Sequence, residues 1–135
     1  MAGGKEAVTS LAGRTFEFAL RTMKLYAFLE KRSGAERVIG KQLLRSGTSI
    51  GANVEEAQGG QSRADFVAKY GIALKEARET CYWLRLLGES GLVGRSRLET
   101  LLQEASEIAK ILAASILTAK GRTVAGKAQR RKGNT

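Results

Sequence analysis

Apolar residues recur at intervals of three and four along four segments of the chain, which is the spacing of one face of an α-helix. This spacing predicts helices at about residues 11–32, 36–58, 63–89 and 97–119. The connections between them are short, and short connections force successive long helices to run antiparallel. The pattern therefore predicts an all-α protein, folded as an up-down-up-down four-helix bundle over residues 11–119.

Three of the predicted helix starts carry the residues of a capping box, a serine followed three positions later by an acidic residue. The pairs are Ser33 with Glu36, Ser62 with Asp65, and Ser96 with Glu99. Each pair opens an apolar run, and glycines such as Gly34, Gly59 and Gly60 stand where a helix is expected to stop. The caps and the apolar spacing thus predict the same three helices independently.

Each helix carries one apolar stripe that we expect to face the core. The four stripes are Phe16, Ala19, Leu20, Met23, Ala27 and Glu30; Ile39, Leu43, Ile50, Val54 and Ala57; Phe66, Tyr70, Leu74, Ala77, Cys81 and Leu84; and Leu98, Leu101, Ala105, Ile108, Leu112 and Ser115. Further apolar residues lie outside these stripes: Phe18, Leu25, Leu29, Val67, Ile72, Trp83, Leu86, Leu102, Ala109 and Ile116. A monomeric bundle needs roughly three apolar positions in seven. We interpret the surplus as subunit contacts, although scattered surface hydrophobes are the ordinary alternative.

The second helix also carries a polar stripe beside its apolar one. Its members are Ser46, Ser49, Asn53 and Glu56. Serine, asparagine and glycine are mediocre helix formers, so their concentration in mid-helix indicates close packing with hydrogen bonds across to another helix. The third helix offers Glu76 and Glu79 as partners, with Arg45 or Arg78 to offset their charge. We interpret the stripe as a structural polar network that fixes helix register, in preference to a catalytic site.

The segments Arg45–Ala57, Ser62–Tyr70 and Glu79–Leu84 together resemble the family of four helix bundle proteins. That family includes proteins encoded in intervening sequences of bacterial large-subunit ribosomal RNA genes, and the accessory proteins of diversity-generating retroelements look like relatives. The family pattern on the second helix is roughly Arg-x-x-x-Ser-Ile-Pro/Gly-x-Asn-Ile-x-Glu-Gly. The matching residues are Arg45, Ser49, Ile50, Asn53 and Glu56, with Glu79 on the third helix. Gly51 stands where proline is common, and Ala57 stands where glycine is common.

This resemblance covers about residues 14–120 and implies a ring-shaped homopentamer of bundles with a basic face. For the retroelement relatives it implies binding to a reverse transcriptase and to nucleic acid. The complete absence of proline from this chain is consistent with four long uninterrupted helices.

The composition argues against most site chemistry. The chain has no histidine, so a zinc site, a histidine base and the Glu-x-x-His pairs of a di-iron bundle are not expected, despite the paired acids Glu76 and Glu79. No glycine-rich phosphate loop is present. The one cysteine, Cys81, lies in an apolar stripe and is expected to be a small buried hydrophobe. We therefore expect a protein that is not an enzyme and that uses no metal or cofactor.

Positive charge is concentrated at the C-terminus. The formal net charge is +10, of which +6 falls in residues 120–135. This segment contains no acidic residue, and we expect it to be disordered. We also expect residues 1–10 to be flexible. The cations of this tail are Lys120, Arg122, Lys127, Arg130, Arg131 and Lys132. Arg37, Lys41 and Arg45 share one face of the second helix, and Arg21 and Lys24 lie on the first. A phosphate backbone is the partner that such cations favour, whereas solubilisation is the plainer alternative.

These patterns predict a non-enzymatic homo-oligomeric scaffold that binds nucleic acid, with RNA favoured over DNA. The more specific hypothesis is an accessory subunit of a retroelement reverse transcriptase, which would bind RNA or cDNA and the polymerase. Two alternatives stay open: an RNA-binding protein encoded in a ribosomal RNA intervening sequence, and a protein adaptor that binds no nucleic acid. The sequence carries no membrane segment and no signal peptide, so a cytoplasmic location is expected.

Overall fold

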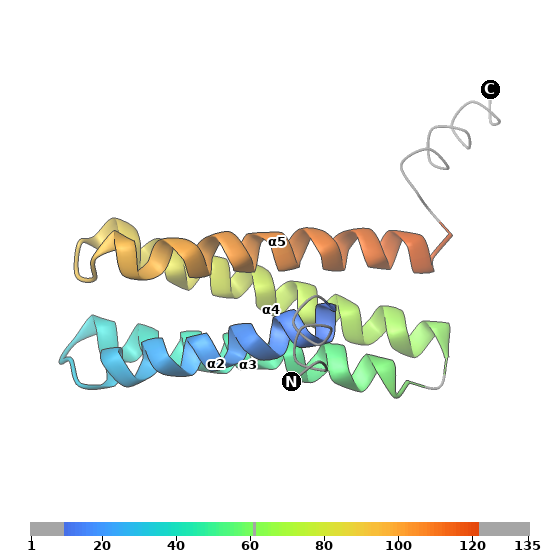
Figure 1. Cartoon of the computed structure of the whole chain (residues 1–135), viewed down its shortest axis with the longest axis horizontal. Helices are drawn as coiled ribbons and strands as arrows, with labels where there is room; N and C mark the ends of the chain where they lie inside the picture. The colour runs from blue at the N-terminus through green and yellow to red at the C-terminus, as the bar shows by residue number, and fades with distance from the viewer. Residues whose placement is uncertain (1–9, 61, 122–135) are drawn as a thin grey trace, which may run out of the picture.

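The computed structural model describes residues 10–60 and 62–121, and all regular structure in these two ranges is α-helical. Its four helices are α2 (Leu11–Glu30), α3 (Ala35–Gln58), α4 (Arg63–Ser90) and α5 (Arg95–Ala119). The chain reverses direction at each connection (Figure 1), so the predicted all-α fold of four antiparallel helices is confirmed. Only Ser10, Lys120 and Gly121 of the two predicted flexible ends fall within the described residues.

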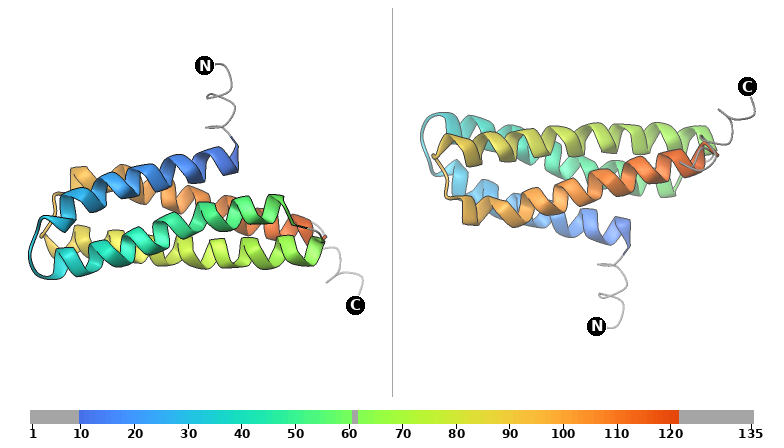
Figure 2. Two further views of the ribbon diagram at one scale, coloured as in Figure 1. Left: turned by 90° about the horizontal axis from the view of Figure 1, so that it is seen from below. Right: turned by 90° about the horizontal axis from the view of Figure 1, so that it is seen from above.

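Successive helices pack side by side, and α5 returns to contact α2, which closes the bundle. The seam between α2 and α5 is the most open of the four, and the two helices diverge toward the start of α2 (Figure 2). Within the described residues, the backbones of α2 and α4 do not approach each other closely, so these two helices occupy opposite corners of the bundle. None of the four helices carries an apolar stretch long enough to span a bilayer.

The helix starts agree only in part with the predicted caps. Ser62 caps α4 as predicted, because its Oγ accepts from the Asp65 backbone N–H at 3.1 Å. The predictions for Ser33 and Ser96 are wrong: the N-cap residues of α3 and α5 are Gly34 and Gly94, and neither helix has a side-chain cap. Ser96 already lies inside α5, where its backbone is helical and cannot adopt the extended conformation of a cap. Ser10 caps α2, as its Oγ accepts from the Gly13 N–H at 3.0 Å.

The core confirms most of the predicted stripes of α3, α4 and α5 but contradicts the stripe predicted for the first helix. Phe16 and Met23 are 56% and 53% exposed, and Leu20 is 38% exposed. The buried face of α2 is instead Thr15, Phe18, Thr22, Leu25 and Leu29. Two threonines occupy core positions because their hydroxyls are satisfied by the helix itself. Thr15 Oγ1 donates to the Ala12 carbonyl at 3.1 Å, and Thr22 Oγ1 donates to the Phe18 carbonyl at 2.9 Å.

Glycines on α3 let α2 approach closely. A Cβ added at Gly47 would lie 2.8 Å from Thr22 Cγ2, and one added at Gly51 would lie 3.2 Å from the backbone oxygen of Thr15. Nearer the start of α3, a Cβ at Gly40 would meet Leu29 Cβ at 3.0 Å. The buried residues of α2 therefore pack against a groove on α3 that is formed by glycines, which have no side chain. This observation confirms the close packing predicted from the glycine and serine content of the helix.

Candidate functional site

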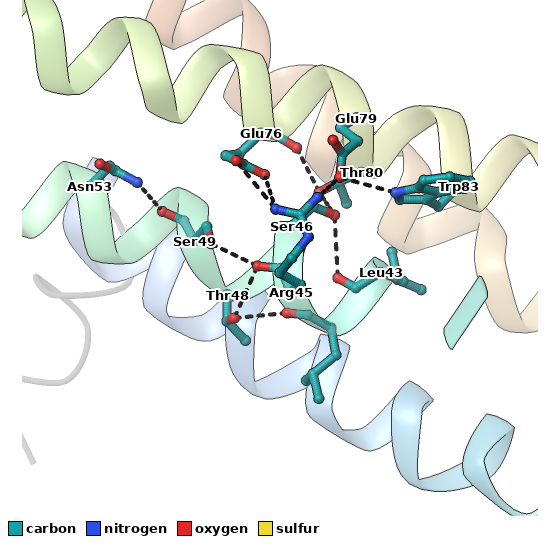
Figure 3. Close-up of polar contacts among 11 residues, drawn as sticks. Leu43, Arg45, Ser46, Thr48, Ser49, Asn53, Glu76, Glu79, Thr80 and Trp83 are labelled. Carbon is teal, nitrogen blue, oxygen red and sulfur yellow. Dashed lines mark hydrogen bonds and ion pairs between the residues drawn. The ribbon is translucent and has the colours of Figure 1, made fainter. Parts of the chain in front are cut away.

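The largest polar cluster of the described residues joins α3 to α4 on the surface of the bundle (Figure 3). Arg45 of α3 reaches between two acids one turn apart on α4. Its Nη1 lies 3.2 Å from Glu76 Oε2, and its Nη2 contacts Glu79 Oε2. Trp83 Nε1 donates to the same Glu79 oxygen at 3.2 Å. One guanidinium thus fixes the register of two helices, and Arg45, rather than Arg78, offsets the paired carboxylates.

Beneath this cluster, two fully buried hydroxyls connect the same helices. Thr80 Oγ1 of α4 lies 2.9 Å from Ser46 Oγ of α3 and 2.8 Å from the Glu76 carbonyl oxygen. Both residues have no exposed surface. The predicted cross-helix bond of Ser46 is therefore confirmed, but its partner Thr80 was not foreseen. Its position one turn from both Ala77 and Leu84, on the buried face of α4, is the pattern that could have indicated it.

The other members of the predicted network behave differently. Ser49 Oγ donates to the Arg45 carbonyl at 2.7 Å, and Asn53 Nδ2 donates to the Ser49 carbonyl at 2.9 Å. These bonds stay within α3, so the prediction that Ser49 and Asn53 bond across to another helix is wrong. Short polar side chains can bond the carbonyl one turn back, which satisfies them without a partner helix. Glu56 does reach α4, where Lys69 Nζ lies 2.8 Å from its Oε2 at the surface.

The polar groups between α3 and α4 serve to hold these two helices together. Within residues 10–60 and 62–121, every buried side-chain nitrogen and oxygen has a hydrogen-bond partner. The same residues contain no group of three potential metal ligands. Burial raises the pKa of the Cys81 thiol, which keeps it protonated and poorly nucleophilic near neutral pH. The Arg45 cation is engaged by two carboxylates, so it is not free to bind an anion.

The predicted nucleic-acid-binding residues divide into four groups. Arg37 and Lys41 are exposed on α3 and form no ion pair in the part of the chain that the structure describes. Arg45, on the same face, is engaged by Glu76 and Glu79. Lys120 follows the last residue of α5 and is exposed. The remaining tail residues, Arg122, Lys127, Arg130, Arg131 and Lys132, lie outside the described residues.

These features define an all-helical bundle whose second and third predicted helices are tied by a buried hydroxyl pair and a surface ion-pair cluster. The family model described as 23S rRNA-intervening sequence protein matches residues 10–114. The chain belongs to this family. The match runs from the cap of α2 to the last turns of α5.

A solved structure supports the same assignment. The crystal structure at 1.70 Å of a protein of unknown function from the S23 ribosomal protein family of Bacteroides thetaiotaomicron VPI-5482 is 45% identical to this chain. The similarity covers 79% of this chain and 98% of that one, with a TM-score of 0.73. A comparison with functionally curated proteins gives no match. The family match and this structural similarity therefore agree on the family and on the fold.

Proposed function

We propose that this protein is a non-enzymatic, homo-oligomeric scaffold that binds nucleic acid, with RNA favoured over DNA. The observation that carries the proposal is the uneven charge: +6 in residues 120–135 on a bundle that is itself basic. Cations without carboxylate partners gain most from a polyanion, because binding releases the counterions condensed on its phosphates. The family name, which refers to an intervening sequence of 23S rRNA, favours RNA.

The exposed apolar residues support the oligomeric part of the proposal. One group, Phe16, Leu20 and Met23, lies along α2. A second group, Ile72, Tyr82 and Leu86, lies on α4 at the opposite corner of the bundle. Two different apolar faces on opposite sides of a subunit favour a heterologous contact between copies, and such contacts close into rings when the rotation allows it. This arrangement is consistent with the pentamer implied by the family resemblance.

Native mass spectrometry tests the assembly. The chain has a mass of 14.5 kDa, so a pentamer is distinguished at once from a monomer or dimer. A Leu20→Glu substitution places a charge in the exposed face of α2 and should dissociate the assembly while leaving the helical content intact. A wild-type protein that is monomeric at micromolar concentration contradicts the oligomer.

Truncation after Ala119 tests nucleic-acid binding by the tail. Affinity for a labelled single-stranded RNA is measured by fluorescence anisotropy over a range of salt concentrations. Six cations that neutralise six phosphates would change the slope of log affinity against log salt by up to about 4, at roughly 0.7 per phosphate. An unchanged affinity and slope after truncation would show that the tail is not the binding element.

The accessory role beside a retroelement reverse transcriptase is the more specific form of this proposal. It predicts a reverse transcriptase gene next to the gene of this protein, and co-purification of the two proteins. A position inside a ribosomal RNA gene would select the ribosomal alternative instead. An adaptor without nucleic acid predicts a partner complex that survives nuclease treatment.

A further inference from the structure

The seam between α2 and α5 contains a hollow that belongs to none of the clusters described so far. It is an open depression of about 240 Å³ between the C-terminal half of α2 and the first turns of α5. The lining residues are Arg21, Lys24, Leu25, Arg97, Thr100 and Leu101. Leu25 and Leu101 are buried and form the apolar part of the lining, whereas all the charged groups are cations. The volume far exceeds the ~10–15 Å³ that one water requires.

The cations of the hollow are oriented by neighbouring side chains and not by carboxylates. Arg21 Nη2 donates to Thr100 Oγ1 at 2.9 Å across the seam. The Arg97 guanidinium carbon lies 3.9 Å from the centre of the Phe28 ring, which orients this arginine from α5 onto α2. Arg32 packs over the same ring at 4.6 Å, so a further cation gathers beside the hollow.

No carboxylate of the described residues lies within ion-pair distance of Arg21, Lys24 or Arg97. The acid one turn beyond Thr100 on α5 is Glu104, and it is already engaged by Arg14 through contacts of 2.6 and 3.1 Å. Positive charge gathered in this way repels itself unless an anion neutralises it. Arg45, by contrast, meets two carboxylates.

We infer that this hollow is a binding site for a phosphate group of a nucleic-acid backbone. The inference rests on the proposed function and adds to it a defined site on the folded bundle. Guanidinium forks match the oxygens of a phosphate, and two of them line this hollow together with an ammonium group. Lys120 is ~35 Å away along α5 at 1.5 Å per residue, so the hollow and Lys120 are separate contacts.

The test compares two full-length double variants that have the same reduced charge. The hollow variant is Arg21→Gln with Arg97→Gln, and the control is Arg63→Gln with Arg78→Gln, two exposed arginines of α4 without ion pairs in the described ranges. Circular dichroism and native mass check that both variants fold and assemble as the wild type does. The probe is a labelled 20-nucleotide single-stranded RNA, measured by anisotropy across salt concentrations.

The hollow variant should bind more weakly than the control, and its salt slope should be less negative by roughly 0.7 for each phosphate that it no longer neutralises. The exposed Lys24→Gln substitution should produce a smaller change in the same direction. Equal affinity and equal slope of the hollow variant and the control overturn the inference and leave the proposed function standing. Displacement of the RNA by polyglutamate as effectively as by unlabelled RNA assigns the hollow to acidic protein and also overturns it.

A second measurement separates the site from the proposed function. Inorganic pyrophosphate is titrated into isotope-labelled wild-type protein, and the amide resonances of Arg97 and Thr100 are followed. If the wild type binds no RNA but pyrophosphate shifts these resonances, the proposed function fails while the phosphate site stands. If neither RNA nor pyrophosphate binds, both fail.

Discussion

Replacing Gly47 with alanine tests whether the packing of α2 on α3 requires a residue without a side chain. Gly47 is buried in α3, and an added Cβ would lie 2.8 Å from Thr22 Cγ2 and 2.9 Å from Thr22 Oγ1. Thr22 is itself buried, and its hydroxyl donates to the Phe18 carbonyl, so its side chain cannot rotate away without breaking that bond. We therefore expect the new methyl group to force the two helices apart.

Two opposing effects set the size of the change. Alanine is favoured over glycine inside a helix by about 0.5–1 kcal/mol. Overpacking a close-packed interface costs about 1–3 kcal/mol. Gly71, on α4, is the matched control because it is exposed in a helix interior and an added Cβ there meets nothing within 4 Å. Gly71→Ala should stabilise the protein, and Gly47→Ala should be about 1–3 kcal/mol less stable than that control.

Urea unfolding followed by circular dichroism measures both variants. The protein concentration is held constant, because assembly makes the apparent stability depend on it. The double variant Thr22→Ala, Gly47→Ala removes both atoms that the new methyl meets most closely, so it should be more stable than the sum of the single changes predicts. Equal stability of Gly47→Ala and Gly71→Ala would refute the close-packing argument.

Three further predictions concern the polar groups. Thr80→Val removes a hydroxyl that is bonded to buried Ser46 and should lower the free energy of unfolding by about 1–3 kcal/mol. The double variant with Ser46→Ala should lose less stability than the sum of the two single losses, and strictly additive losses would contradict the pairing. Arg45→Gln should cost about 1 kcal/mol, and it should alter the fluorescence of Trp83 because Glu79 is left without its cation; no change in either measurement contradicts the tie. Burial raises the pKa of Cys81 and of Tyr70, so the unfolded state ionises first and stability should fall as pH rises above the ordinary thiol value of 9.0. Cys81→Ala should weaken that fall, and an identical pH dependence in the variant speaks against it.

The fold could be predicted from the sequence because helix period and short connections indicated four antiparallel helices, and the Ser62 cap marked the start of one of them. The face of the first helix could not. Phe16, Leu20 and Met23 form the more apolar stripe, yet the core of α2 contains Thr15 and Thr22. A hydrophobicity count gives no weight to a threonine whose hydroxyl bonds its own helix and whose methyl fits a glycine. For this reason the more apolar face of α2 is not the face that it buries.

The polar network was predictable as far as complementary charge allowed. Arg45, Glu76 and Glu79 could be matched because opposite charges at helical spacing on neighbouring helices have few other partners. Ser49 and Asn53 could not be assigned in the same way, since a short polar side chain can bond either a neighbouring helix or its own backbone. The sequence did not indicate Arg97 and Thr100 as site residues, because only the packing of α5 against α2 brings them beside Arg21 and Lys24.

The two sides of the bundle use polar residues in opposite ways. Between α3 and α4, the buried hydroxyls have partners and Arg45 meets two carboxylates, so adding a ligand there would first require breaking bonds that hold the helices together. Between α2 and α5, the packing is more open, and Arg21, Lys24 and Arg97 face a hollow without an acid. A bound anion would gain the attraction of these cations without breaking an ion pair of the described residues. An anionic partner is therefore expected to bind at the seam between α2 and α5, where the helices pack least closely.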